Sequence, residues 1–180
     1  MQGDDVSLIA QMQRGDRGAM QALYGRYKDD LLTAARCLLG DLSAAEDCLH
    51  DVFVAFAADT RRFRPARSLK GYLITCISNR ARDQMRKQTR RVALKGTEGH
   101  EEFDSPGPPG HLAAKEEAEA VSAALAQLPY EQREVVTLHI HAELTFREIA
   151  RYQGVPLSTA QARYRYGLEK LSGALSGERP

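Results

Sequence analysis

Tryptophan is absent from this chain of 180 residues, and cysteine is scarce. The three cysteines, Cys37, Cys48 and Cys76, are odd in number and never spaced as Cys-x-x-Cys, which disfavours a disulfide scaffold and a zinc site. No run approaches about 18 apolar residues, and the first residues lack the basic and apolar segments of a signal peptide. We therefore expect a cytoplasmic protein with no membrane insertion, no metal and no cofactor.

A net charge of one sign is also missing, because 25 Lys and Arg residues nearly balance 24 Asp and Glu residues. This balance excludes a uniformly basic tail that binds nucleic acid by charge alone, and equally an acidic chaperone-like chain. With 27% charged and 43% hydrophobic residues, the composition is that of a folded globular chain. The length allows one domain or two small ones.

The charges are unevenly distributed along the chain. Residues 29–59 carry seven acids and one base, residues 61–95 carry twelve bases and one acid, and residues 96–120 carry seven acids and one base. An acidic block beside a basic block predicts surfaces for two different partners. We expect the basic block, residues 61–95, to contact nucleic acid.

The spacing of apolar residues is helical nearly throughout, and no segment shows the alternation of a strand. It predicts helices over residues 20–39, 43–59, 69–91, 114–127, 131–141, 145–153 and 157–175. Ser43 is the expected N-cap of the second helix, with Glu46 and Asp47 in its first turn. Residues 61–68 are expected to form a basic loop, and residues 93–113, rich in Gly, Pro and acids, a linker.

Residues 145–171 have the spacing of a helix-turn-helix, whose second helix enters the major groove of DNA. Thr145 and Glu148 predict a capping box, and Gly154 predicts the tight turn before Pro156. The second helix is expected to bury Ala160, Tyr164, Leu168, Leu171 and Leu175. Its other face presents Ser158, Thr159, Gln161, Arg163 and Arg165, and side chains of these types bind base edges and phosphates.

Two sets of segments resemble a known family. Leu125–Leu138 and Leu144–Pro156 resemble region 4 of the extracytoplasmic-function (ECF) sigma factors, a subfamily of the sigma-70 RNA polymerase sigma factors. Leu23–Tyr27, Gly40–Phe53, Phe63–Leu73 and Asn79–Arg86 are similar to region 2 of the same family. The resemblance covers about 150 of the 180 residues, in the family's order.

The resemblance implies an all-α fold of two small helical domains. Region 2, a helical bundle, would occupy residues 1–92, and region 4, the helix-turn-helix, residues 114–178, joined by a flexible acidic Gly/Pro-rich linker over residues 93–113. It implies a sigma factor that binds core RNA polymerase and directs promoter recognition, strand opening and transcription initiation. The implied partners are core RNA polymerase and promoter DNA, an anti-sigma factor is a further candidate, and no enzymatic activity is expected.

The resemblance and the residue types together assign candidate sites. The polymerase-binding residues are the acids Glu46, Asp47 and Asp51. The candidate residues for the −10 element combine aromatic rings that can stack on unstacked bases, an amide that can read a base edge, and cations that can hold phosphates. They are Arg61, Phe63, Arg64, Lys70, Tyr72, Asn79, Arg80 and Arg86. The residues for the −35 element are Arg147, Arg151, Ser158, Thr159, Gln161, Arg163 and Arg165.

The chain departs from the family pattern at a few positions. The family usually has Trp near Ala57 and near Tyr72, a basic residue near Gln161, a hydrophobic residue near Gln153 and Arg near His139. These departures concern the −35 sequence preference more than the role.

From the residues alone, two other functions stay open. One is a stand-alone helix-turn-helix transcriptional regulator, and the other is a nucleic-acid enzyme with Glu46, Asp47 and Asp51 as metal ligands. Stimulation of purified core polymerase on a matching promoter would separate all three functions.

Overall fold

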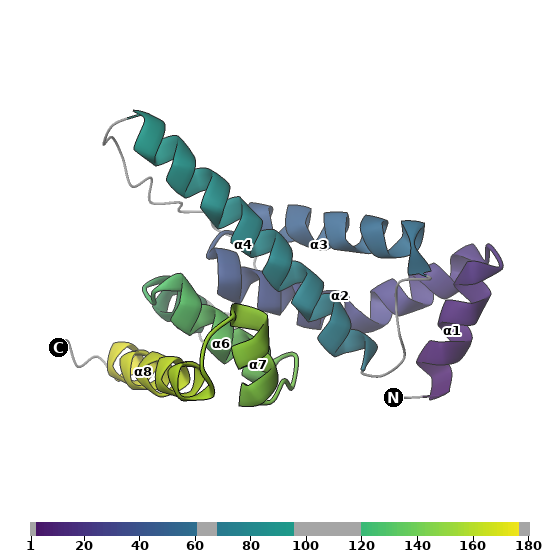
Figure 1. Cartoon of the computed structure of the whole chain (residues 1–180). Helices are drawn as coiled ribbons and strands as arrows, with labels where there is room; N and C mark the ends of the chain where they lie inside the picture. The colour runs from purple at the N-terminus through teal and green to yellow at the C-terminus, as the bar shows by residue number, and fades with distance from the viewer. Residues whose placement is uncertain (1–2, 61–67, 96–119, 177–180) are drawn as a thin grey trace.

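The computed structural model describes residues 3–60, 68–95 and 120–176, which form helices joined by short turns without a strand (Figure 1). The helices are α1 (Gly3–Gln13), α2 (Arg17–Leu39), α3 (Leu42–Ala58), α4 (Leu69–Lys95), α6 (Tyr130–Ile140), α7 (Phe146–Gln153) and α8 (Leu157–Leu175). Residues 120–126 are helical as well. The predicted all-α fold is confirmed for these residues, and none of their helices is long and apolar enough to cross a membrane.

The junction between α2 and α3 is set by Gly40 and Asp41. Gly40 ends α2 in the left-handed conformation, with φ of 76°, and the Asp41 side chain then accepts a hydrogen bond of 2.6 Å from the Ala44 N–H. The N-cap of α3 is therefore Asp41, and the prediction of Ser43 was wrong. Because α3 begins at Leu42, Glu46 and Asp47 lie beyond its first turn, where the helix dipole favours acids less.

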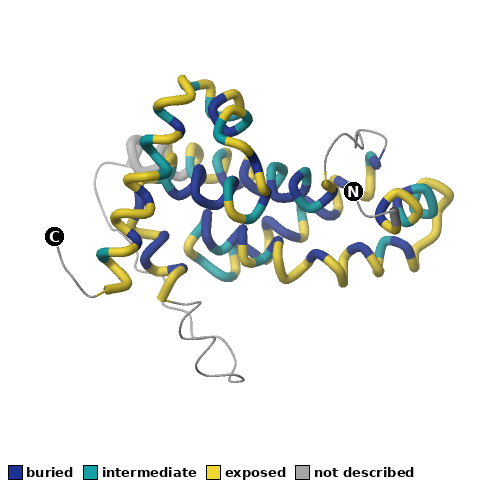
Figure 2. The backbone as a smooth tube through the Cα atoms, turned by 90° about the horizontal axis from the view of Figure 1, so that it is seen from below, coloured by how far each residue is buried: buried dark blue, intermediate teal, exposed yellow. Residues whose placement is uncertain are grey.

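One buried apolar cluster runs through α1–α4, the N-terminal part, and α6–α8, the C-terminal part. Its members include Leu31 and Leu38 of α2, Phe53 of α3, Leu73 and Ile77 of α4, Leu138 of α6, Ile149 of α7 and Ala160 of α8. In Figure 1 α6, α7 and α8 lie along one side of α2 and α4, and α3 lies on the other. Buried positions alternate with exposed ones along the helices (Figure 2), as amphipathic packing requires.

Two helical parts were expected, and they pack directly on each other. Gly71 of α4 lies so close to the α6–α7 turn that an added Cβ would be 2.9 Å from the Ala142 carbonyl oxygen. The predicted linker, residues 93–113, lies outside the described residues except for residues 93–95, which belong to α4. The domain boundaries at 92 and 114 stay predictions.

The predicted helix-turn-helix is present as α7 and α8. The Thr145 N–H donates to Glu148 Oε2 at 2.9 Å in the expected capping box, and Gly154 turns the chain with φ of 68°. His139 stacks on Phe146 with ring centroids 4.4 Å apart, and the Tyr164 ring meets both edge-on. This aromatic cluster fixes α6, α7 and α8 against one another.

The buried stripe of α8 differs from the predicted one at two positions. The side chains of Leu168 and Leu175 are 39% and 51% exposed. Gly167, which was not part of the predicted stripe, is buried. Successive residues of an α-helix are rotated by about 100°, so a stripe through Ala160 and Gly167 turns Leu168 outward. Gly167 permits the close approach of α6, because an added Cβ would be 3.1 Å from a methyl carbon of Val136.

His141, where α6 ends, lies half-buried at the junction of the two parts. Burial lowers its pKa from the ordinary 6.5, and the positive charge of Lys70 on α4 lowers it further, while Asp30 on α2 opposes this. Lys70 and Asp30 themselves form an ion pair of 2.6 Å. The folded chain therefore holds His141 neutral at a pH where the unfolded chain protonates it.

We expect the free energy of unfolding to fall as the pH drops below about 6.5, because between the two pKa values the unfolded chain binds the extra proton. Guanidinium denaturation at pH 7.5 and pH 5.5 measures this fall. His141→Asn should make the pH dependence shallower, since it removes the titrating ring. An identical pH dependence in the variant would show that other groups cause the effect.

Candidate polymerase and nucleic-acid interface

The acidic face of α3 points outward, as a protein-binding surface requires. Glu46 and Asp47 are exposed, and Asp51 is half-buried. Asp51 forms an ion pair with Arg80 of α4, so a predicted polymerase contact is joined to a predicted DNA contact. Among the described residues no group of three or more His, Cys, Asp or Glu side chains is placed to hold a metal ion.

A pocket of about 450 Å³ lies between α3 and α4 and brings together three predicted −10 residues. Tyr72, Asn79 and Arg80 line it, together with Phe56 of α3 and Cys76 of α4. The rings of Phe56 and Tyr72 are tilted to each other at 6.2 Å between centroids. An aromatic wall and an amide are groups that bind an unstacked base, and a guanidinium is one that binds a phosphate. The carboxylates of Asp51, Asp59 and Asp83 line the same pocket, and Asp51 is paired with Arg80.

The other predicted −10 residues lie elsewhere. Lys70 is at the start of α4, paired with Asp30, and Arg86 is exposed further along the same helix. Arg61, Phe63 and Arg64 lie outside the described residues.

The predicted −35 residues share an outward side of the helix-turn-helix. Arg147, Arg151, Ser158, Gln161 and Arg165 are exposed, and Thr159 and Arg163 are partly buried. Arg165 lies 4.9 Å from the Tyr166 ring and 3.8 Å from the Glu169 carboxylate. Arg163 is restrained, because its Nη1 donates to Gln153 Oε1 at 2.7 Å.

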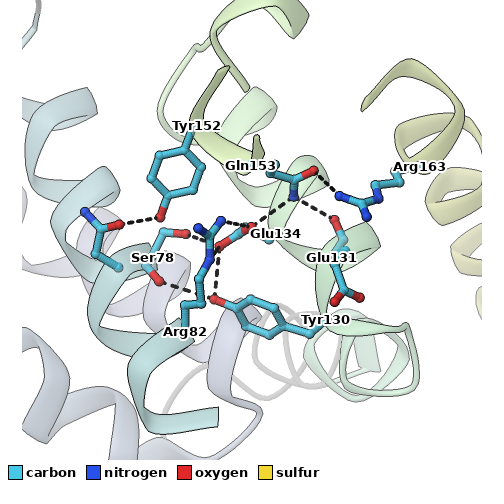
Figure 3. Close-up of polar contacts among 9 residues, drawn as sticks. Ser78, Arg82, Tyr130, Glu131, Glu134, Tyr152, Gln153 and Arg163 are labelled. Atoms are coloured by element: carbon cyan, nitrogen blue, oxygen red, sulfur yellow. Dashed lines mark hydrogen bonds and ion pairs between the residues drawn. The ribbon is translucent and has the colours of Figure 1, made fainter. Parts of the chain in front are cut away.

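A polar network centred on Glu134 of α6 joins the two parts, and it is not among the predicted sites (Figure 3). The Glu134 side chain is only 1% exposed. Arg82 of α4 donates to both of its oxygens, at 3.2 and 2.5 Å, and the Ser78 hydroxyl donates at 2.8 Å. Tyr130 and Gln153 complete the set, at 3.2 and 2.9 Å.

The titration behaviour of this network follows from burial and from the charge of Glu134. Burial by itself would lower the pKa of Arg82, but the hydrogen bond and the charge of Glu134 raise it. Burial and the same carboxylate raise the pKa of Tyr130. Both groups, Arg82 and Tyr130, therefore keep their protons.

A second contact between the parts involves Asn79, which is predicted to bind a base of the −10 element. The Tyr152 hydroxyl of α7 donates to Asn79 Oδ1 at 2.9 Å, and the Arg82 guanidinium lies 4.5 Å from the centre of the Tyr152 ring. A signal for Glu134 existed in the sequence, since it lies four residues before the buried Leu138, on the inward side of α6. No signal indicated its partners on α4, Ser78 and Arg82, which lie more than 50 residues away.

Comparisons with known proteins agree with this arrangement. Residues 23–91 match the family described as Sigma-70 region 2, and residues 118–171 match Sigma-70, region 4. The ECF RNA polymerase sigma factor RpoE of Cereibacter sphaeroides is 30% identical over 139 residues, 74% of either chain. The ECF RNA polymerase sigma factor EcfG of Rhodopseudomonas palustris is 29% identical over 156 residues, 82% of this chain and 84% of the relative.

A solved structure has the same fold. It is the sigma factor RpoE in complex with the anti-sigma factor NepR from Bartonella quintana, with a TM-score of 0.68 and 24% identity over 88% of this chain and 98% of that chain. The helical bundle and the helix-turn-helix, together with the two family matches, identify this chain as a sigma factor of the sigma-70 type. The relatives narrow the class further: the chain belongs to the extracytoplasmic-function sigma factors.

The chain is therefore a sigma factor that binds core RNA polymerase and promoter DNA and directs transcription initiation. The match to region 2 spans most of α2, all of α3 and most of α4. A stand-alone helix-turn-helix regulator does not account for this match. The carboxylates considered as metal ligands lie along the outward face of α3, and one of them is paired with Arg80.

Proposed function

We propose a division of labour among three surfaces. The α3 face with Glu46 and Asp47 binds core polymerase, the α3–α4 pocket holds opened bases of the −10 element, and the outward face of α8 reads the −35 duplex. The observation that carries the proposal is the single pocket that collects Tyr72, Asn79 and Arg80. Residues 72 and 79 are two helical turns apart, so they face the same hollow.

The remaining assignments extend the proposal. The protein acts in the cytoplasm, and it contributes binding and positioning rather than a catalytic group of its own. An anti-sigma factor is a further proposed partner, supported by the likeness of this fold to a sigma factor solved with the anti-sigma factor NepR. Asp51 is proposed to contribute less to polymerase binding than Glu46 and Asp47, because it is paired with Arg80.

Reversing both Glu46 and Asp47 to Lys should abolish copurification with core polymerase. Both side chains are exposed, so the fold should tolerate each change within roughly 0.5 kcal/mol. Circular dichroism checks the fold, and pull-down of purified core polymerase measures binding. Asp29→Lys is the matched control, since it reverses an exposed acid on α2. A folded double variant that still binds core polymerase would refute the assignment of α3.

A promoter pre-opened over the −10 element separates the two DNA surfaces. Arg163→Ala and Arg165→Ala should weaken −35 recognition, by about 1–3 kcal/mol where a bidentate base contact is lost. Tyr72→Ala should impair strand opening and be partly rescued by pre-opening, because unpairing has then already occurred. Asn79→Ala should lose base preference on both templates.

The measurement is open-complex formation by holoenzyme on the ordinary and the pre-opened duplex. Rescue of the two arginine variants by pre-opening, with Tyr72→Ala left unaided, would contradict this division between the pocket and α8.

A further inference from the structure

A hollow of about 410 Å³ opens where α4, α6, α7 and α8 meet, and it is none of the three surfaces proposed above. Its volume lies within the range of about 300–1,000 Å³ that is usual for small-molecule sites. Three arginines and two glutamates line it: Arg82, Arg86, Arg163, Glu131 and Glu134. The kind of ligand that fits the hollow therefore depends on which of these charges are already neutralised.

One arginine and one glutamate of the lining neutralise each other. Glu134 accepts five hydrogen bonds, two of them from Arg82, although a carboxylate offers only about four lone-pair sites. It has no capacity left for a ligand. The Glu131 side chain is exposed and in Figure 3 points away from Arg163. The charges that remain for a ligand are those of Arg86 and Arg163, and both are positive.

Gln153 of α7 holds the Arg163 guanidinium in one orientation. Both N–H groups of Gln153 are donated, one to the Glu131 carbonyl oxygen at 3.1 Å and one to Glu134 Oε2 at 2.9 Å. Gln153 Oε1 therefore faces the other way, where it accepts from Arg163 Nη1 at 2.7 Å. Within the described part of the chain Arg163 has no other hydrogen bond or ion pair, so its remaining N–H groups form a fork that suits phosphate oxygens.

Arg86 reaches the same hollow from α4, one helical turn beyond Arg82. Its side chain is exposed, and no ion pair joins it to a carboxylate in residues 3–60, 68–95 or 120–176. Two cations that line one hollow repel each other, and an anion bound between them replaces this repulsion with two attractions. Two guanidinium groups require acceptor oxygens on two sides of the anion, which a chain of phosphates provides and a single carboxylate does not.

We propose that this hollow is a binding site for a small polyphosphate anion, either inorganic or the phosphate chain of a nucleotide. Arg86 and Arg163 bind the phosphate oxygens, and Gln153 is the positioning residue that orients Arg163. The two sources share this chemistry, and the Tyr130 ring, which also lines the hollow, is the group that would favour a nucleotide by stacking on its base. The site does not depend on the division of surfaces proposed above, because it takes a ligand other than the promoter.

The first test is calorimetric titration of the full chain with inorganic triphosphate, at a salt concentration of about 0.15 M that screens distant charges. Arg163→Ala and Arg86→Ala should each weaken binding about tenfold, because each removes charge-assisted hydrogen bonds. Arg165→Ala is the matched control, since it removes the same charge from an exposed position of α8 about 200° around the helix. It should leave the affinity within about twofold.

Three results of this titration would overturn the site. They are no binding at about 1 mM triphosphate, equal affinities in wild type and Arg163→Ala, and a loss in Arg165→Ala as large as that in Arg163→Ala. Arg86→Ala keeps the proposal falsifiable if Arg163→Ala fails to fold, because Arg86 is exposed. Circular dichroism checks the fold of each variant.

The second test asks whether Gln153 acts through Arg163. Gln153→Leu should weaken triphosphate binding about three- to fivefold in the wild-type background and not at all in the Arg163→Ala background. A merely structural role of Gln153 would weaken binding equally in both backgrounds. Equal losses would therefore overturn its positioning role.

The third test identifies the source of the phosphates by titration with ATP and with a single-stranded thymidine tetranucleotide. Affinity for ATP at least tenfold above that for triphosphate would support a nucleotide as the ligand, and equal affinities would support inorganic polyphosphate. A tetranucleotide that binds as tightly as triphosphate, with the same loss in Arg163→Ala, would assign the hollow to a nucleic-acid backbone and overturn the small-anion site.

Discussion

The arrangement of the two parts depends on one buried carboxylate, that of Glu134. A charge with 1% of its side chain exposed requires a cation and further donors, and α6 itself supplies only Tyr130. Arg82 and Ser78 of α4 and Gln153 of α7 provide the rest. The C-terminal part is therefore stabilised in one position on α4, and the position of α7 over Asn79 and of Gln153 beside Arg163 follows from it.

This constraint orders the surfaces of the sigma factor. The acids Glu46 and Asp47 on α3 are exposed while the two parts are joined, so the face proposed to bind polymerase is open to solvent. Of the residues assigned to DNA, Asn79 accepts a hydrogen bond from Tyr152 of α7, and Arg163 lines a hollow together with Arg86 of α4. The acidic face of α3 is thus independent of the contact between the parts, whereas Asn79 and Arg163 take part in it or lie beside it.

Local features could be predicted from the sequence because they depend on neighbouring residues. The capping box at Thr145, the turn at Gly154 and the grouping of Tyr72 with Asn79 each involve residues within two helical turns. The start of α3 was misplaced because Asp41 and Ser43 are both good caps, and the left-handed Gly40 decides between them. Leu168 was misplaced because Gly167, without a side chain, carries no hydrophobic signal yet faces α6.

Contacts between distant residues could not be predicted. The ion pairs Asp51–Arg80 and Arg82–Glu134 each join two different helices. The apolar periodicity of one sequence shows which face of each helix is buried, but not which residues of two helices lie opposite each other. Gln153 departs from the hydrophobic residue usual in the family, but only the structure shows that it connects Glu134 with Arg163.

The central claim is that the buried carboxylate of Glu134 holds the C-terminal part in one position on α4. The most direct measurement is the distance between spin labels at the exposed positions Val54 on α3 and Tyr166 on α8, by pulsed electron resonance, in the wild-type chain and in Glu134→Gln. We predict one narrow distance in the wild type and a broader distribution with longer distances in Glu134→Gln, because the substitution leaves the charge of Arg82 without its partner. The same narrow distance in both proteins would contradict the account.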